Sequence, residues 1–252
     1  MSTLPLAPEE YLSLLEGLTS RFQHTLRTAE LDSPVVSCGD WRLRDLGAHL
    51  GDIHRWAARI VITGERPEQA FASDPGPGVA DWYADSAAEL IEAFRGADPA
   101  APCWHFGGGG KDKAFWFRRQ VQETAMHLFD ASLAAGAPVR FAPVVAADGV
   151  DEVLTVLLPK VQRWHAAPPL PKPLLVRTVD TGHAWLVRPA DGDGPPLAST
   201  VADGENAETS VEAYAEDLLL FMWKRRPAGE SGLKTTGEPA VSMDFLGAGL
   251  TP

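Results

Sequence analysis

The sequence predicts two domains, a bundle of four helices over residues 1–140 and a smaller α+β domain over residues 141–252. The first observation is that apolar residues recur at intervals of three and four in four segments, which Gly- and Pro-containing loops separate. The second is a change after Gly136, where short β-type runs and turn residues follow the long helical patterns. A length of 252 residues accommodates one large domain or two small ones.

The first and third helices each show one apolar face. The first is expected to begin near Pro8, a favoured first-turn residue, with Glu9 and Glu10 at the positive end of the helix dipole. Its buried face consists of Tyr11, Leu15, Leu18, Phe22 and Leu26. The third follows a loop over residues 64–79, and its buried face consists of Tyr83, Ala87, Leu90 and Phe94.

The second helix is expected over residues 41–63, from an N-cap at Asp40 to a stop at Gly64. The face expected to point into the core consists of Trp41, Asp45, His49, Ile53, Trp56 and Ile60. On this face His49 is either a hydrogen-bonded core histidine or a metal ligand. His54 lies about 140° further around the helix, so the two histidines should not bind one ion. We expect His54 either on the surface or beside a ligand without binding the ion itself.

The fourth helix is expected over residues 114–135, because Gly136 and Pro138 end an uninterrupted helical pattern. Glu123 and His127 are four residues apart, which places both side chains on one face, one turn apart. Taken alone, a Glu-x-x-x-His spacing is a weak indication of a metal site. If the second and fourth helices face each other, His49, Glu123 and His127 supply three ligands and leave one open position, as catalytic zinc sites do.

The C-terminal domain is expected to begin with a helix over residues 144–164, followed by a Pro-rich connector over residues 166–173. Strands over residues 174–179 and 184–188 flank a hairpin turn, and a third strand covers residues 198–202. Thr209 and Glu212 resemble a capping box for a last helix that ends near Arg226, before Pro227. A weak strand near Val241 closes the chain.

Composition excludes several classes of function. The net charge of −12 argues against a nucleic-acid partner, which would need clustered basic residues. Cys38 and Cys103 form no disulfide framework and no CxxC pair. No basic n-region or long apolar segment indicates a signal peptide or a membrane span, so we expect a cytoplasmic protein without membrane attachment. The glycine run 107–110 lacks the setting of a phosphate-binding loop.

Several motifs together resemble one family, the mycothiol-dependent maleylpyruvate isomerase relatives. The segment Trp41-Arg-Leu-Arg-Asp45-Leu-Gly-Ala-His49 is similar to the family's Trp-x-x-x-Asp-x-x-x-His element. The segment from Arg119 through Glu123, His127 and Asp130 is similar to its Arg-x-x-x-Glu-x-x-x-His-x-x-Asp-Ala helix. The C-terminal pattern is matched by Ala147-Asp-Gly-Val-Asp-Glu152, by Asp180-Thr-Gly and by Asp217-Leu-Leu-Leu-Phe-Met-Trp-Lys-Arg225.

The resemblance implies a DinB-like four-helix bundle and a sterol-carrier-protein-like α+β domain. It implies zinc, or a similar divalent metal, held by His49, Glu123 and His127. The basic residue that the family carries at the end of the last helix corresponds best to Arg225, beside Lys224 and Arg226. Lys224 stands where relatives often carry a small residue. Asp130 is expected either to orient a ligand or to lie on the helix surface.

The function implied is that of an enzyme in which mycothiol, bound to zinc as a thiolate, attacks a small electrophile, giving cis–trans isomerisation or S-transfer. His49 and Arg225 are the expected catalytic residues. Arg119 and Arg225 are expected to bind the cofactor or a substrate carboxylate, with a salt bridge to Glu123 or a surface position as the alternatives for Arg119. The partners are then a thiol and a small substrate, and the chain a monomer or weak dimer. The alternative functions are a hydrolase that uses zinc-bound water and a non-catalytic small-molecule binding protein.

Overall fold

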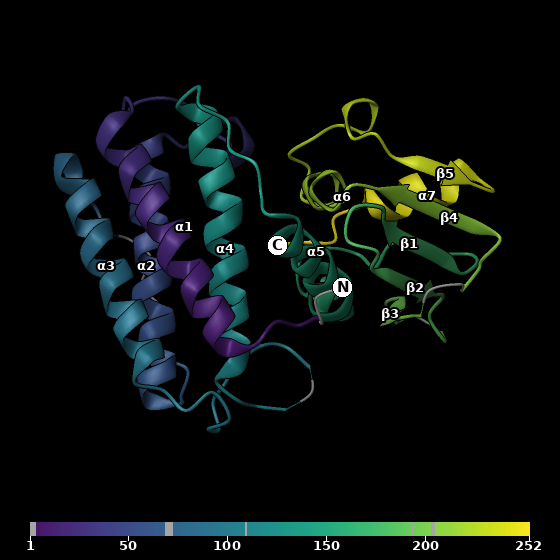
Figure 1. The fold of residues 1–252 in the computed structure, drawn as a ribbon, viewed down its shortest axis with the longest axis horizontal. Coiled ribbons are helices and arrows are strands. Elements are labelled where there is room, and N and C mark those ends of the chain that lie inside the picture. Colours follow the sequence, from purple (N-terminus) through teal and green to yellow (C-terminus); the bar gives the residue numbers. More distant parts are fainter. Residues whose placement is uncertain (1–3, 69–72, 109, 193, 203–204) are drawn as a thin grey trace. The chain divides into compact units, whose positions relative to one another are not determined.

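The computed structural model describes residues 4–68, 73–108, 110–192, 194–202 and 205–252. The start of the N-terminal segment and parts of the expected loops 64–79, 107–110 and 191–196 lie outside these ranges. The chain divides into two compact units, a helical unit over Leu6–Arg140 and a mixed unit over Phe141–Pro252, to which the N-terminal end also belongs (Figure 1). Each unit is described by itself below.

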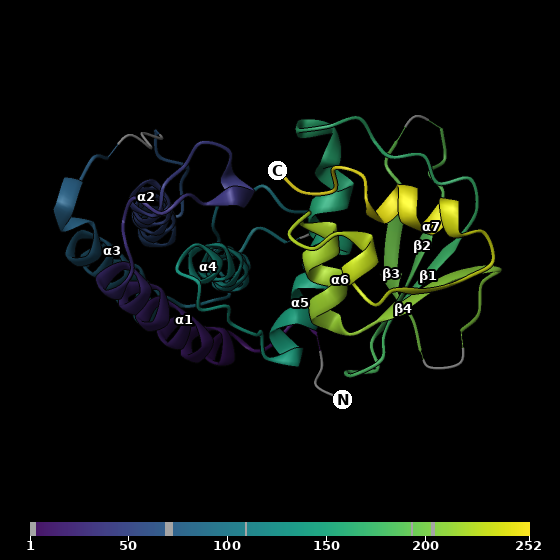
Figure 2. The same cartoon turned by 90° about the horizontal axis from the view of Figure 1, so that it is seen from above.

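The helical unit contains four long helices, α1 (Pro8–Thr28), α2 (Leu43–Thr63), α3 (Val79–Arg95) and α4 (Ala114–Ala134). Helix α1 packs against α3 and α4, and α2 packs against the same two helices. Figure 2 shows α2 and α4 nearly end-on and next to each other. The four helices predicted from the periodicity are therefore all present, and α2 and α4 face each other.

Local sequence sets the ends of these helices. Glu10 caps the start of α1 by accepting the backbone N–H of Ala7, at 3.0 Å. The N-cap of α2 is Arg42 and not Asp40 as predicted, because the carboxylate of Asp45 accepts the backbone N–H of Arg42 at 2.7 Å. Gly64 and Gly136 follow α2 and α4 with φ of 75° and 67°, a left-handed conformation that glycine adopts without steric cost.

The core of the helical unit contains the predicted apolar faces of α1 and α3, with Leu15, Phe22, Tyr83 and Leu90 fully buried. Helix α2 differs from the prediction. Its buried stripe passes through Leu43, Leu46, Leu50, His54, Ala57 and Val61. Of the predicted core face that contains His49, Ile60 is buried, Asp45 is exposed, and the other residues are half-buried. The buried stripe is shifted around the helix because the small residues Gly47, Gly51 and Ala58 allow close packing there. The ring of Trp82 leaves no room for a Cβ at Gly51.

The mixed unit is built on a five-stranded sheet. Its strands are β1 (Leu174–Thr178), β2 (Ala184–Arg188), β3 (Leu197–Thr200), β4 (Thr209–Ala213) and β5 (Lys234–Thr236), in the order β3-β2-β1-β4-β5. Strands β1 and β4 are parallel, and the other pairs are antiparallel. Helices α5 (Pro143–Glu152), α6 (Ala215–Met222) and α7 (Pro239–Leu246) complete the unit. The predicted hairpin at residues 174–188 is present.

The helices predicted after residue 144 and before Pro227 are present as α5 and α6, but the structure corrects three details of this unit. Residues 209–213 form a strand, because Thr209, Val211 and Ala213 are buried in alternation and pair with β1. The segment near Val241 is helical, because Pro239 begins α7 at a position where a missing N–H costs nothing. The helix expected over residues 144–164 is α-helical only as far as Glu152. It continues as π-helix over Val153–Leu157 and as 3-10 helix over Leu158–Arg163, because Pro159 has no N–H for an α-helical hydrogen bond.

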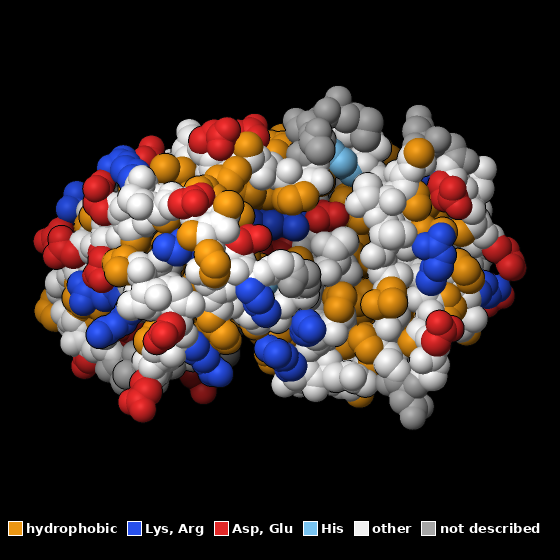
Figure 3. Space-filling model, turned by 90° about the horizontal axis from the view of Figure 1, so that it is seen from below, with side chains coloured by type: hydrophobic (Ala, Val, Ile, Leu, Met, Phe, Trp, Pro, Cys, Tyr) orange, Lys and Arg blue, Asp and Glu red, His pale blue; other side chains and the backbone are white. Residues whose placement is uncertain are grey.

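Within the ranges that the structure describes, no helix combines the length and the apolar character that crossing a membrane requires. Figure 3 shows acidic and basic side chains interspersed over the helical unit on the face that it displays.

Candidate metal centre

Three side chains from α2 and α4 converge in the helical unit. Nε2 of His127 lies 3.3 Å from Oε1 of Glu123, and Nε2 of His49 lies 3.9 Å from the same oxygen. The two imidazole rings are 5.3 Å apart between centroids and nearly perpendicular. The side chains of His49, Glu123 and His127 are 25%, 19% and 13% exposed. The structure thus brings together the three residues that the sequence suggested as ligands, and each of these side chains is partly exposed.

His54 does not join this group. It is fully buried in α2, where Nδ1 donates to the amide oxygen of Gln120 at 2.9 Å and Nε2 accepts from the hydroxyl of Tyr83 at 3.2 Å. The prediction that His54 lies apart from His49 is confirmed. The expected surface position is wrong, because two distant polar side chains satisfy the buried ring.

Arg119 keeps the carboxylate of Glu123 ionised. Its guanidinium is buried and lies 2.5 Å from Oε2 of Glu123, one turn along α4. Burial on its own raises the pKa of Glu123, but the charge of Arg119 and the hydrogen bond with His127 bring that pKa well below its usual value. Glu123 is therefore an ionised carboxylate with one oxygen, Oε1, directed at the two histidines.

Asp130 holds the other side of the His127 ring. Oδ2 of its buried carboxylate accepts the Nδ1–H of His127 at 3.3 Å, and Oδ1 accepts the Ser37 hydroxyl at 2.6 Å. Burial lowers the pKa of His127, but Asp130, Cys38 and Glu123 outweigh this and raise it well above the ordinary value. Of the two expectations for Asp130, the surface position is wrong.

His49 is in a different environment. Burial lowers its pKa, and the neighbouring His127 lowers it further, against the opposing charges of Glu123 and Asp52. The ring of Trp41 lies against it, with centroids 4.8 Å apart. His49 is thus suited to be a neutral imidazole, the form that binds metals.

The donor set fits a borderline-soft divalent cation such as zinc. One carboxylate oxygen and two ring nitrogens lie within 4.8 Å of one another, close enough for one ion to bind all three at ordinary bond lengths. An ion at Nε2 of His127 would take the place of the proton that the ring holds there. Asp130 on the far side of that ring is the kind of partner that zinc-binding histidines usually have.

A second group of possible donors shares His127. Cys38, His127 and Asp130 also place one donor atom each within 4.8 Å of the others, and Sγ of Cys38 lies 3.8 Å from Oδ2 of Asp130. Sequence analysis missed Ser37 and Cys38 as neighbours of this site, because both lie in a loop more than 90 residues before Asp130. Their position could have been inferred only from the tertiary fold.

Two family models match this chain, one over each unit. The model of the mycothiol maleylpyruvate isomerase N-terminal domain matches residues 14–132, and that of the MDMPI C-terminal domain matches residues 144–242. Together the two matches span most of the chain. The chain belongs to the mycothiol maleylpyruvate isomerase family.

Solved structures show the same fold. The crystal structure of the mycothiol-dependent maleylpyruvate isomerase is 16% identical, with a TM-score of 0.64 over 94% of this chain and 97% of that chain. A histidine-to-alanine mutant of that enzyme gives 15% identity and a TM-score of 0.62 over the same shares. At these identities the likeness establishes the fold alone. No curated protein sequence matches this chain significantly.

The basic residues after α6 belong to the mixed unit. Arg226 forms ion pairs with Asp217 and Glu216 of α6, and these carboxylates compensate its charge within the unit. Arg225 is half-buried, donates to the carbonyl of Trp223 at 2.9 Å and lies over the Trp223 ring. Lys224 is exposed at φ 58°, a left-handed position that a small residue, glycine above all, adopts most easily.

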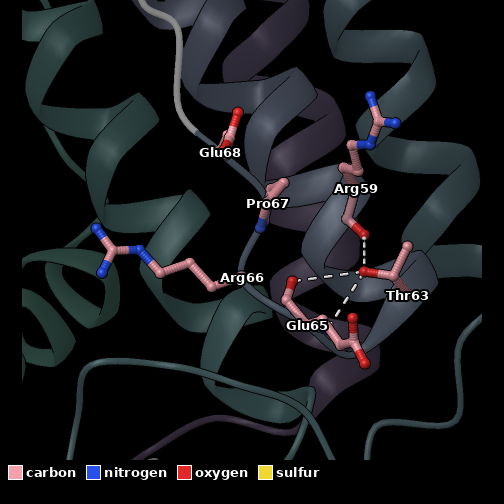
Figure 4. A pocket seen from close by; sticks show the side chains of 6 residues that line it. All are labelled: Arg59, Thr63, Glu65, Arg66, Pro67 and Glu68. Carbon is pink, nitrogen blue, oxygen red and sulfur yellow. Dashed lines mark hydrogen bonds between the residues drawn. The ribbon is translucent and has the colours of Figure 1, made fainter.

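A pocket of about 400 Å³ lies at the C-terminal end of α2, apart from the histidines (Figure 4). It is lined by Arg59, Thr63, Glu65, Arg66, Pro67 and Glu68. Arg59 and Arg66 extend away from each other, and Arg66 stacks on Trp104. Arg59 is ten residues beyond His49, about 15 Å along the helix axis, so this pocket does not contain the converging side chains.

Proposed function

We propose that this protein is a zinc-dependent enzyme of the mycothiol maleylpyruvate isomerase family that uses mycothiol as the nucleophile on a small electrophile. The observation that carries the proposal is the convergence of His49, Glu123 and His127 on one point from two facing helices. Membership of the family and the common fold support the thiol-dependent isomerase reaction. Zinc, and S-transfer as the variant reaction, are the finer parts of the proposal.

The chain supplies the ligands and their charge. His49 and His127 offer neutral nitrogens, and Glu123 offers one carboxylate oxygen while Arg119 holds the other. One anionic and two neutral ligands leave a zinc ion with net positive charge. Zinc bound there would lower the pKa of a coordinating thiol so that it reacts as a thiolate.

The reaction needs no further nucleophile from the protein. Addition of the thiolate to a carbon–carbon double bond makes that bond single, so the substrate can rotate about it. Departure of the thiolate then restores the double bond and yields the geometric isomer, whereas protonation of the neighbouring carbon retains the sulfur and yields an adduct. We assign Arg225 to a carboxylate of the substrate or of mycothiol, as the basic residue that follows α6. Arg119 would contribute through Glu123, with which it is paired.

For the architecture, we propose that residues 1–140 form a DinB-like metal-binding domain and residues 141–252 a sterol-carrier-protein-like domain. The arrangement α1–α4 with ligands on α2 and α4 supports the first assignment. A mixed sheet accompanied by three helices supports the second.

The experiment is an assay of the zinc-loaded protein on maleylpyruvate, the compound in the name of the relatives, with and without mycothiol. Proton NMR of the products separates isomerisation from adduct formation. The proposal expects turnover only when both zinc and mycothiol are present. Zinc-dependent turnover without any thiol would favour a hydrolase, and metal-independent binding without turnover would favour a binding protein.

A further inference from the structure

The loop between α1 and α2 is held in a closed conformation. The backbone N–H of Val35 donates to the carbonyl of Trp41 at 2.9 Å, and that of Leu43 donates to the carbonyl of Ser33 at 3.0 Å. Val35 is buried, and Gly39 permits the tight reversal with φ 65°. The side chains between these anchors are therefore presented from a fixed backbone.

This loop is linked to His127 indirectly, by the hydrogen bond from Ser37 to Asp130. The Asp130 side chain has no exposed surface, and each of its oxygens has a partner, the Ser37 hydroxyl for Oδ1 and Nδ1 of His127 for Oδ2. A carboxylate held in this way can accept Nδ1–H only when the imidazole keeps one orientation. Nε2 is then the nitrogen that faces Glu123, and it does so at 3.3 Å.

The same loop contacts His49 directly, through Trp41. The indole of Trp41, at the end of the loop, lies against the imidazole at 4.8 Å between centroids with a tilt of 55°. An aromatic neighbour at this distance restricts rotation of the His49 ring about its side-chain bonds. One loop thus contacts both histidines, although they belong to different helices.

We infer that Ser37 and Trp41 are positioning residues of the proposed metal site, Ser37 acting through Asp130 on His127 and Trp41 acting on His49. The inference rests on the proposed function. It adds two residues outside α4 to the site and makes the Val35–Trp41 loop the element that fixes the directions of both ring nitrogens.

The expected effects are on metal affinity as well as on turnover. Loss of an outer partner of a zinc-binding histidine typically weakens metal binding about 10- to 100-fold. We expect Asp130→Asn to fall in this range, with Ser37→Ala and Trp41→Ala each weakening binding about tenfold. Trp41→Phe should restore most of the loss. The losses of zinc affinity from Ser37→Ala and Asp130→Asn should be less than additive in the double variant, because both substitutions break the hydrogen-bond chain from Ser37 through Asp130 to His127.

The test measures zinc affinity by competition with a chelator on the full chain, together with the visible spectrum of the cobalt-substituted protein, which reports ligand geometry. Ser132→Ala is the matched control. It removes a buried α4 hydroxyl that donates to the carbonyl of Phe129 and accepts the backbone N–H of Val139, so among the described residues it bonds to none of the proposed ligands. Circular dichroism and thermal melting establish that each variant is folded.

The inference expects weaker zinc binding and a changed cobalt spectrum in folded Ser37→Ala, Trp41→Ala and Asp130→Asn, with the control unchanged. If the wild-type chain binds zinc and these variants bind it within twofold with the same cobalt spectrum, this inference alone is overturned. A loss confined to variants that have unfolded also overturns it, because the role is then only structural. Failure of the wild-type chain to bind zinc overturns the proposed function and this inference together.

Discussion

Nε2 of His127 lies 3.3 Å from Oε1 of Glu123, one turn earlier in the same helix. The spacing of four residues along α4 creates this contact, and α2 brings His49 to the same oxygen. Glu123 is ionised because Arg119 compensates its charge, so the carboxylate is available to a cation. The predictions below follow from this cluster and from the residues that surround it.

Removing either histidine should abolish tight metal binding. We expect His49→Ala and His127→Ala to weaken zinc binding by more than about 100-fold, because each loses a direct ligand and not only an outer partner. Elemental analysis after dialysis measures the zinc content. His24→Ala, on the exposed face of α1, is the surface control. His54→Ala, in the buried core, should also keep its zinc. Full metal content in His49→Ala or His127→Ala would refute the ligand assignment.

His54 should make the stability of the fold depend on pH. Its burial brings its pKa from 6.5 to about 4, so between these values the unfolded chain binds a proton that the folded chain does not. The free energy of unfolding therefore decreases as pH falls from 6.5 to 4, by on the order of 3 kcal/mol from this one group. Urea denaturation of the wild type and of His54→Gln across this range measures the difference. Equal pH slopes for both proteins would contradict the account.

Neither cysteine should be required for catalysis. Burial raises the pKa of Cys103, which keeps it in the unreactive thiol form. Cys38 lies beside Asp130, but the proposed nucleophile is an external thiol. We expect Cys38→Ser and Cys103→Ala to retain turnover within a fewfold of the wild type. A folded variant that lacked all activity would show that the protein supplies its own sulfur.

Arg225→Ala should lose turnover and keep its zinc. Loss of one charge-assisted hydrogen bond costs about 1.5–3 kcal/mol, a decrease of roughly 10- to 100-fold in kcat/KM. Lys224→Ala, which removes the exposed neighbouring charge, is the control and should be close to the wild type. Arg226→Ala should instead lower the melting temperature, because it removes the ion pairs that Arg226 makes with Glu216 and Asp217. Unchanged turnover in Arg225→Ala would remove this residue from the mechanism.

Regular patterns in the sequence were enough to predict the four helices and the spacing of Glu123 and His127. Periodicity failed where distant partners decide the outcome. His54 is buried because Gln120 and Tyr83, 66 and 29 residues away, satisfy its ring. Residues 209–213 carry a Thr-x-x-Glu pattern typical of a helix start, but pairing with β1 stabilises a strand there.

The surroundings of the metal centre were the least predictable part. The link from Ser37 to Asp130 joins residues 93 positions apart and has no local pattern. Arg119 could be placed beside Glu123 from the four-residue spacing, as one of the alternatives considered. That its guanidinium is buried, and so determines the charge of Glu123, depends on the packing of the whole unit.

The most direct test of the central claim is a titration of the cobalt-substituted protein with mycothiol, followed by absorption in the near ultraviolet. The Cys38→Ser variant should be used, because Cys38 lies close enough to His127 to supply a sulfur signal of its own. We expect a thiolate-to-cobalt charge-transfer band that grows to saturation at one mycothiol per chain and is absent in His127→Ala. A spectrum that mycothiol leaves unchanged, with turnover that proceeds without it, would contradict the account.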